Sequence, residues 1–552
     1  MFKVYRRVSR SLRGTLLPKR QWKTNIFRRR CAVNKCTVVI RRQGMPDCEI
    51  EVFEGQSLMD AMIAGGVYVS AACGGKGLCG KCGVLVCEGV LPVTAEDRKT
   101  FSEEQLNRGM RLSCMAYPAD DVVVSVIQQD EEQFYVLGSA ENLSVKGRDG
   151  EASEGRYFIA VDLGTTTLAL SLADERGGVA DTYTGVNHQR AYGADVISRI
   201  QASNEGNGPE LTASIREDLK HGVNALLQNN GMDASAVCKV VIAGNTTMGH
   251  LLMGYDCSTL GQVPFTPVNI DTVKTTWGQL FGDGLSEQTP VILMPGFSTF
   301  VGGDILSGLL STGFVGRETP ALFVDLGTNG EMAVGTGQRI FVTSTAAGPA
   351  FEGGNISCGM GSVAGAICSA VIDGEQRVFE TLGGKPAAGI CGTGVIEVTA
   401  ELLKEELLDE TGLLDEEYFD DGFPLEGDLA LSQADIRQLQ LAKAAVRAGV
   451  ETLLMRYGLE YDQVGEVFLA GGFGVHLNIE KAVAIGLLPE ELKDKVKSVG
   501  NSALAGALYY GSHEQAESEC EQLRAVAAEV DLSTDQDFQE FYMDGMMFGN
   551  PE

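Results

Sequence analysis

The stretch YFIAVDLGTTT at residues 157–167 decides the fold of most of the chain, and a near-copy, ALFVDLGTNGE, follows at 321–331. Each predicts a buried apolar strand that ends at an Asp, followed by a turn rich in Gly and Thr. A third strand runs into the glycine turn LAGGFG at 469–474. Strands alternate with amphipathic helices from here to about residue 512. This alternation predicts an α/β architecture, and the repeated turn predicts two similar halves.

The two Asp-containing turns predict phosphate binding. Their N–H and hydroxyl groups can surround phosphate oxygens. Asp162 and Asp325 would orient Mg²⁺ through waters, or a water for attack, because Mg²⁺ keeps much of its hydration shell. The glycines of the third turn would let a base and ribose lie against the backbone. One such turn is weak support, but two copies and a glycine turn together predict a nucleotide site, and neither a Walker A motif nor G-x-G-x-x-G occurs.

Four cysteines upstream form the pattern C-x5-C-x2-C-x31-C: Cys73, Cys79, Cys82 and Cys114. This spacing is close to that of plant-type [2Fe–2S] ferredoxins, whose thiolates hold the two irons. Zinc would need two C-x2-C pairs or histidine partners, and only one such pair is present. Short strands and helices surround the pattern, so we expect an α+β, β-grasp-like ferredoxin domain. Cys87, on the next strand, is interpreted as a small core residue.

Composition narrows the class of protein. The chain has 552 residues and a net charge of -30, which argues against a nucleic-acid partner because such a partner needs a basic face. It contains no run of about 18 apolar residues, so we expect no membrane span. Its 14 Cys occur in a long chain without an apolar signal stretch. A cytoplasmic location, with some Cys used as metal ligands, is therefore expected.

Composition shifts also predict the domain boundaries. Residues 1–35 form a basic, disordered leader with no acidic residue, interpreted as a targeting segment, an arm for an acidic partner, or upstream sequence that is not translated. The ferredoxin domain is expected at 36–129 and a polar, Gly-rich linker at 130–155. The duplicated domain, with two similar α/β halves and the predicted nucleotide site, is expected at 156–515. Residues 516–552 are expected to form an acidic C-terminal tail.

The chain from about 36 to 545 resembles the reductive activators of corrinoid proteins. That family joins an N-terminal [2Fe–2S] ferredoxin to an ATPase domain of the actin/sugar kinase/Hsp70 superfamily. The strings that carry the resemblance, besides the turns quoted above, are YGADVISRI (192–200), AGNTTMGHLL (243–252), VPFTPV (263–268), TSTAAGPAFEGGNISCGM (343–360), GICGTGVIE (389–397) and DIRQLQLAKAAVRAGVETLL (435–454). The short linker departs from relatives that carry an extra linking domain, so their docking geometry is not transferred.

The resemblance implies ATP-dependent return of an electron from the cluster to Co(II) of a corrinoid protein, giving the Co(I) needed for methyl transfer in a methyltransferase system. It also implies ATP, Mg²⁺, an external low-potential electron donor and a homodimer as one state of the chain. No corrinoid-binding D-x-H-x-x-G string occurs here, so the cobalt is expected on the partner.

The matched strings also assign residues. Asp162 and Asp325 are the expected catalytic residues, and His250 is expected to be packed or solvated. The nucleotide-binding residues implied by the strings are Asp162, Gly164, Thr165, Thr166, Thr167, Asn245, Asp325, Gly327, Thr328, Asn329, Gly330, Glu331, Gly392, Gly394, Gly471, Gly472 and Gly474. Asn245 and Thr246 are equally compatible with a role in sensing the phosphate or a partner and with a structural cap. Gly348, Pro349 and Glu352 are also expected to reach the nucleotide site.

Three other functions fit part of the pattern. A small-molecule kinase with a ferredoxin appendage would need a base aimed at a substrate hydroxyl. A redox-sensing ATPase or binding module would use the cluster to modulate ATP turnover. An activator of a 2-hydroxyacyl-CoA dehydratase has a similar ATPase but bridges a [4Fe–4S] cluster between subunits and has no ferredoxin domain.

Overall fold

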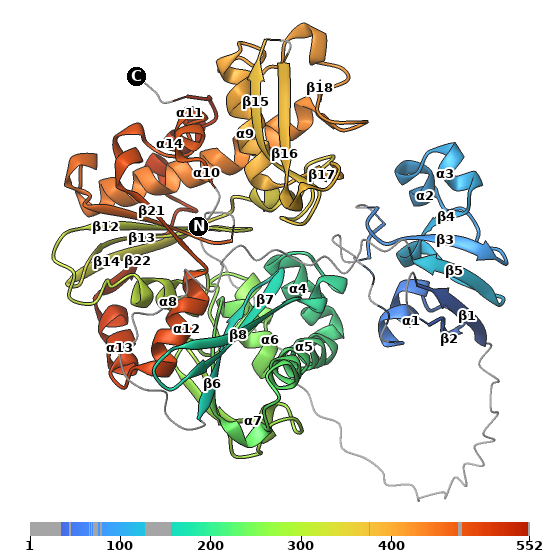
Figure 1. The fold of residues 1–552 in the computed structure, drawn as a ribbon, viewed down its shortest axis with the longest axis horizontal. Helices are drawn as coiled ribbons and strands as arrows, with labels where there is room; N and C mark the ends of the chain where they lie inside the picture. The colour runs from blue at the N-terminus through green and yellow to red at the C-terminus, as the bar shows by residue number, and fades with distance from the viewer. Residues whose placement is uncertain are drawn as a thin grey trace, which may run out of the picture.

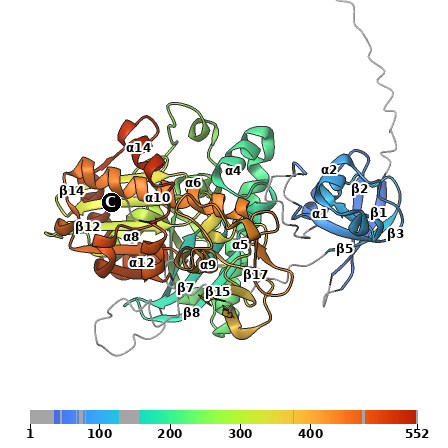
Figure 2. The same ribbon diagram turned by 90° about the horizontal axis from the view of Figure 1, so that it is seen from above.

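The computed structural model describes residues 35–42, 46–65, 67, 69, 75–77, 80–126, 156–374, 376–472 and 477–549. The expected linker, and the expected leader apart from Lys35, lie outside these residues. Figures 1 and 2 show a small N-terminal unit and a larger body that contains two open sheets. None of the helices in the described part of the chain has the length and apolarity that crossing a membrane requires.

The N-terminal unit is a five-stranded mixed sheet with one longer helix and two short ones. Its strands lie in the order β2-β1-β5-β3-β4, and the central pair, β1 and β5, is parallel. The strands are β1 (Lys35–Arg41), β2 (Cys48–Phe53), β3 (Gly83–Glu88), β4 (Met110–Leu112) and β5 (Val122–Val126). The helices are α1 (Leu58–Ala64), α2 (Ala95–Thr100) and α3 (Glu103–Asn107). Alternate residues of β1, such as Val38 and Ile40, are buried, as the predicted α+β ferredoxin fold requires.

The larger body contains two six-stranded sheets with the same core order. The first is β10-β11-β9-β6-β7-β8 and the second is β21-β20-β12-β13-β14-β22. In each, the first strand of an antiparallel three-stranded meander pairs in parallel with a later strand, which pairs in parallel with one more. In the first sheet, β10 adds an antiparallel edge strand. The first-lobe strands are β6 (Tyr157–Leu163), β7 (Thr167–Asp174), β8 (Val179–Val186), β9 (Val237–Gly244), β10 (Val273–Thr276) and β11 (Pro290–Leu293). The predicted duplication is therefore confirmed.

The second-lobe strands begin with the other copy of the turn motif. They are β12 (Ala321–Leu326), β13 (Gly330–Thr336), β14 (Arg339–Thr345), β20 (Glu466–Ala470), β21 (Val496–Gly500) and β22 (Ala527–Glu529). Between β14 and β20 the chain adds a smaller sheet, β16-β15-β17, and a two-stranded ribbon. These strands are β15 (Ala366–Asp373), β16 (Gln376–Thr381), β17 (Gly389–Ile390), β18 (Phe423–Pro424) and β19 (Ala430–Leu431).

Helices α8 and α12 lie in one apolar core that both sheets share. This core joins Phe158 of the first sheet, Phe323 of the second, Leu309 of α8 and Leu508 of α12. The outer faces of the sheets are covered by α5 and α6 in the first lobe and by α9 and α10 in the second. The helices of the two lobes are α4 (Val196–Ala202), α5 (Gly208–Asn229), α6 (Thr246–Met253), α7 (Trp277–Leu280), α8 (Gly303–Ser311), α9 (Gly392–Lys404), α10 (Gln433–Tyr457), α11 (Ile479–Ala484), α12 (Ser502–Ser512), α13 (Ala516–Val526) and α14 (Gln536–Asp544).

The segment expected as an acidic tail is a structural part of the second lobe. β22 pairs in parallel with β14, and α14 packs on α10 (Figure 1). Cys520 and Leu523 of α13 are buried in the core shared by both sheets. These two residues lie three apart on one helix face, so α13 is amphipathic despite its acidic composition. The acidic composition of this segment predicts a solvated tail. The spacing of its apolar residues instead packs α13 against the core.

Candidate functional site

The first of the two predicted phosphate-binding turns, called phosphate turns below, joins β6 to β7 and is fixed by side chains from the following segment. Arg199 Nη2 donates to the Thr165 carbonyl at 2.6 Å, and Asn187 Nδ2 donates to the Gly164 carbonyl at 2.8 Å. A Cβ at position 164 would lie 2.4 Å from the Thr167 carbonyl oxygen, so the turn admits only glycine there. Thr167 itself is the first residue of β7. Arg199 belongs to the YGADVISRI string, which therefore has a structural role at this turn.

The second phosphate turn joins β12 to β13. Asp325 and Glu331 are direct partners across this hairpin, and the Gly327 N–H donates to the Asn329 carbonyl at 3.0 Å. The two phosphate turns meet at one acidic residue, Glu352. Its carboxylate accepts the Thr166 hydroxyl of the first turn at 3.2 Å.

The second turn reaches the same carboxylate. The Thr328 hydroxyl lies 3.2 Å from both Glu352 oxygens. The structure therefore brings together the predicted turns of both lobes around Glu352, a residue of the 343–360 string.

Five carboxylates gather at this junction: Asp162, Asp304, Asp325, Glu331 and Glu352. All five are partly buried. Loss of hydration raises the pKa of Asp162 to about 7, of Asp304 to about 6 and of Asp325 to about 8. For Asp325 the charges of Asp304, Asp162 and Glu352 contribute to this raised pKa, after the loss of hydration.

Glu331 and Glu352 follow the same rule. Burial, and for Glu331 also the charges of Asp304 and Asp325, raises the pKa of both groups. Within the described residues, no group of three or more His, Cys, Asp or Glu side chains is arranged to hold a metal ion directly. The cluster concentrates negative charge that a cation would relieve.

Two residues of this region lie outside the predicted set. Asp304 lies in the first turn of α8, within the sequence VGGD, whose glycines offered a signal similar to that of the phosphate turns. Asn501 caps α12 and donates its side-chain N–H to Asp162 at 2.8 Å. It links the second lobe to the Asp of the first phosphate turn. No sequence motif marks Asn501, because its role depends on the packing of α12 between the sheets.

Asn245 caps a helix and also contacts the first phosphate turn, and its sensing role stays a prediction. Its Oδ1 accepts the Met248 N–H and caps α6, while its Nδ2 donates to the Thr165 hydroxyl at 2.9 Å. The Thr246 hydroxyl instead donates to the Ser298 carbonyl at 2.6 Å. His250 is buried, with a ring nitrogen 2.7 Å from the Thr246 carbonyl oxygen, as expected for a packed histidine.

The glycines predicted to contact the nucleoside or lie near the hinge strand divide between the surroundings of Asp325 and the core. Gly471 has a φ of +96°, and a Cβ there would lie 2.9 Å from an Asp325 carboxylate oxygen. Gly472 is exposed, and Gly474 lies outside the described residues. Gly392 and Gly394 are buried at the start of α9, where a Cβ would approach the backbone of Phe351 or Ile367 to about 2 Å. Close packing explains these two glycines, and their contact with a nucleotide stays a prediction.

Two of the four predicted cluster ligands can be placed. Cys82, beside β3, and Cys114, after β4, are both buried, and their sulfurs lie 3.3 Å apart. The thiol of Cys114 lowers the pKa of Cys82 to about 6. A buried pair of close thiols with an easily ionised member fits two thiolates of an iron–sulfur site. Cys73 and Cys79 lie outside the described residues, and Cys87, expected in the core, is exposed.

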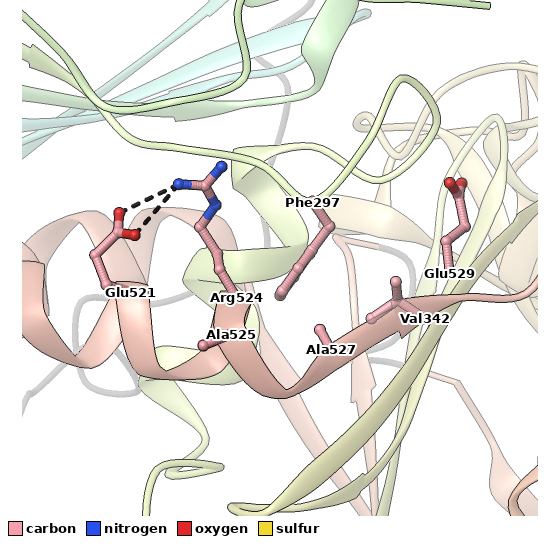
Figure 3. Close-up of a pocket in the computed structure, with 7 residues that line it drawn as sticks. All are labelled: Phe297, Val342, Glu521, Arg524, Ala525, Ala527 and Glu529. Carbon is pink, nitrogen blue, oxygen red and sulfur yellow. Dashed lines mark hydrogen bonds and ion pairs between the residues drawn. The ribbon is translucent and has the colours of Figure 1, made fainter. Parts of the chain in front are cut away.

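A separate cavity of about 330 Å³ lies beside β14 and β22 (Figure 3). It is lined by Phe297, Val342, Glu521, Arg524, Ala525, Ala527 and Glu529. Its charged groups already have partners, because Arg524 bonds to Glu521 and Glu529 accepts the Ser298 hydroxyl at 2.8 Å. We assign no ligand to this cavity.

Two lobes with the same strand order, two packed connecting helices and facing phosphate turns define an ATPase-type domain of the actin/sugar kinase/Hsp70 class. In this chain, that domain follows a ferredoxin unit. Residues 157–317 match the model of the "RACo middle region", and residues 319–552 match the "C-terminal domain of RACo the ASKHA domain". Together these models cover more than half of the chain, which belongs to the RACo family. Residues 41–119 match the "2Fe-2S iron-sulfur cluster binding domain".

Named relatives match over most of their length. The "Corrinoid activation enzyme RamQ" of Eubacterium limosum is 28% identical over 91% of this chain and 98% of its own length. The "[Co(II) methylated amine-specific corrinoid protein] reductase" of Methanosarcina barkeri is 27% identical over 63% of this chain and 68% of its own length. Among solved structures, the "Reductive activator for corrinoid,iron-sulfur protein" matches with a TM-score of 0.66 and 27% identity, over 93% of this chain and 98% of that one.

Proposed function

We propose that this chain reactivates a corrinoid protein by passing one electron to its Co(II) form, in a step that requires ATP. The observation that carries the proposal is the match over 98% of the length of a corrinoid activation enzyme, with both a cysteine-rich ferredoxin unit and facing phosphate turns present in one chain. Either feature alone would fit many proteins. Their combination within one family supports electron delivery that depends on nucleotide.

The ferredoxin unit would supply the electron. Cys73, Cys79, Cys82 and Cys114 would hold a [2Fe–2S] cluster, which would supply one-electron chemistry with electrons from an external low-potential donor. The unit buries Cys82 and Cys114 within its apolar core, which limits the access of water to the sulfurs. The free thiols found among the described cysteines agree with a reducing compartment, and we propose the cytoplasm.

The two lobes would bind ATP and Mg²⁺. Asp325 and Asp162 approach from opposite lobes, and the charge of Asp162 acts on Asp325. We assign them to Mg²⁺, held through its waters, because the closest carboxylates do not form a direct metal cage. Thr165, Thr166, Thr328 and the turn N–H groups would bind the phosphates. Gly471 and Gly472 would admit the nucleoside against the backbone.

In this proposal, ATP binding drives a conformational change that makes an uphill electron transfer possible. A plant-type cluster has a potential of about -400 mV, and each 100 mV of uphill transfer costs about 2.3 kcal/mol. Closure of two lobes around a nucleotide is a two-state change that can bias a bound partner toward the state that accepts an electron. No phosphoryl group needs to pass to a substrate.

The experiment is anaerobic and optical. The full chain with its cluster reduced is mixed with a Co(II) corrinoid protein, with and without Mg-ATP, and the Co(I) absorption band is followed. We expect Co(I) to appear only with Mg-ATP. If ATP is hydrolysed but no Co(I) forms with any of several corrinoid proteins, the proposal fails and a redox-sensing ATPase becomes the better interpretation.

A further inference from the structure

Glu352 occupies a position that the proposed reaction leaves without a role. It ends the short helix Pro349–Glu352, which is bounded by Gly348 and Gly353 with φ angles of +79° and +75°. Ala350 and Phe351 of this helix are buried in the second-lobe core. Gly392, at the start of α9, packs against the Phe351 carbonyl. A Cβ at position 392 would lie 1.9 Å from that carbonyl oxygen, so the position admits only glycine. The backbone of Glu352 is therefore fixed to the second lobe, and its side chain is the part that can move.

The carboxylate of Glu352 is a bridge between lobes. One oxygen accepts the Thr166 hydroxyl from the first phosphate turn, and both oxygens lie within 3.2 Å of the Thr328 hydroxyl from the second. A hydroxyl has one proton to donate. A threonine that donates to Glu352 therefore cannot donate to a phosphate oxygen at the same time. Glu352 and a phosphate are both anions, and they compete for the same two donors.

We propose that Glu352 is a positioning residue that takes the place of the terminal phosphate when no nucleotide is bound. When ATP binds, the Thr166 and Thr328 hydroxyls donate to that phosphate instead of to Glu352. The hydrogen bonds that connect the two lobes then run through the ligand rather than through the protein. This inference rests on the proposed function only in taking ATP as the ligand. It makes Glu352 the residue that distinguishes ATP from ADP.

The segment that follows Glu352 connects this exchange to the rest of the second lobe. The Ser357 N–H and hydroxyl both donate to the Asp435 carboxylate at 2.6 Å. Asp435 is in the first turn of α10, the long helix under the second sheet, and completes its capping box with Ser432. The long string at 343–360 thus joins the phosphate turns to a main helix of the lobe. A change at Glu352 has a direct structural route into that helix.

The test measures nucleotide affinity by titration calorimetry on the full chain, using Mg-ADP and the Mg complex of the β,γ-imido analogue of ATP. Glu352→Gln keeps a hydrogen-bond acceptor but removes the charge. We expect the analogue to bind about tenfold more tightly, because like charges placed side by side cost several kcal/mol. ADP, which lacks the terminal phosphate, should change by less than about twofold. Glu529→Gln, which alters a carboxylate that also accepts a serine hydroxyl, is the matched control and should change neither affinity.

A second set of variants examines the donors. Thr166→Val and Thr328→Val keep the side-chain shape and remove the hydroxyl, so each should weaken binding of the analogue. In the double valine variant, Glu352→Gln should give less than half of its tightening in the wild type, because the shared donors are gone. Hydrogen exchange at the two turns without nucleotide should rise in Glu352→Ala. Thermal unfolding and the visible cluster spectrum verify that each variant is folded.

Several outcomes would overturn the inference. Weaker analogue binding in Glu352→Gln would mean that the carboxylate holds a cation or water in the bound state. Equal tightening of ADP and analogue would indicate a general charge effect. A wild-type chain that forms Co(I) with ATP while Glu352→Gln fails to tighten analogue binding would refute this inference alone. A chain that binds the analogue as expected but never forms Co(I) would refute the proposed function alone.

Discussion

The two lobes share a strand order but contribute different things to the site. The first lobe holds its phosphate turn by polar anchors, in which Arg199 and Asn187 tie down the turn carbonyls. The second lobe carries more charge at its turn, where Asp325 and Glu331 are partners across one hairpin and Glu352 lies against Thr328. Duplication preserved the scaffold, and the chemistry then diverged. The first lobe therefore holds its turn in place with neutral and cationic hydrogen-bond donors, whereas the second lobe carries carboxylates that can respond to a bound ion.

The largest expected effect tests this division at the two Asp residues. Asp325 has the most strongly raised pKa of the three Asp residues in the cluster, which marks the place where a cation relieves most repulsion. Asp325→Asn should slow ATP-dependent Co(I) formation by about 100-fold or more. Asp162→Asn should cost about tenfold, because Asn501 still connects the first turn to α12. Rates are read from the Co(I) band under anaerobic conditions.

The cluster spectrum provides the control for this comparison. Both variants should keep the visible absorption of the iron–sulfur unit, because the changes lie in the lobes. A lost spectrum in Asp325→Asn would contradict the separation of electron delivery from nucleotide binding. Equal losses of rate in both variants would show that the lobes share the charged role evenly.

The next effect concerns the anchors of the first lobe. Arg199 is fully buried, and its guanidinium also donates to the Gly193 carbonyl at 2.9 Å. Arg199→Met should lower the free energy of unfolding by about 2–4 kcal/mol, because buried carbonyls lose charged donors. Thermal unfolding of the full chain measures it. Arg216→Met, which removes a partly buried arginine bound to the Leu252 carbonyl in the same lobe, is the matched control. A control as damaging as Arg199→Met would mean that any arginine of this lobe has the same importance.

Sequence identified the parts of this site that are local. The strand–Asp–glycine turns at Asp162 and Asp325 lie where predicted, because a hairpin turn is encoded within about ten residues. Residues that reach the site from distant parts of the chain carry no local sequence signal. Asn501 bonds to Asp162 only because α12 packs between the sheets, and Asp304 joins the cluster only because α8 lies beside it.

Two expectations drawn from the sequence are wrong for similar physical reasons. Cys87 follows the continuous apolar run Val84–Val86, which predicts a core position. At this point the strand is irregular, and the side chain is exposed. The charge of the segment after residue 515 predicts an acidic tail, whereas the spacing of its apolar residues determines how α13 packs. In both cases the average hydropathy or charge of a segment gave the wrong prediction. The structure depends on which single residues face the apolar core. The expected domain boundaries and ligand assignments remain predictions.

The smallest expected effect is on the pH dependence of stability without nucleotide. Asp162, Asp304 and Asp325 have pKa values of about 7, 6 and 8 in the folded chain, above the usual value of about 3.9 in an unfolded one. Between pH 4 and 8 the folded state therefore binds more protons, and stability falls as the pH rises. The melting temperature should drop by a few degrees from pH 6 to pH 8. Added Mg²⁺ should raise it more at pH 8, where the carboxylates are ionised.

The same measurement can separate the contributions of the two lobes to the pH dependence of the melting temperature. Asp325→Asn should flatten the pH dependence more than Asp162→Asn, since its carboxyl has the higher pKa and the more crowded surroundings. A melting temperature that rises between pH 6 and pH 8 would contradict the buried, protonated cluster. A slope unchanged by Asp325→Asn, with the slope lost in Asp162→Asn, would place the titrating charge in the first lobe. The division of labour between the lobes would then be the reverse of the one inferred from their hydrogen bonds.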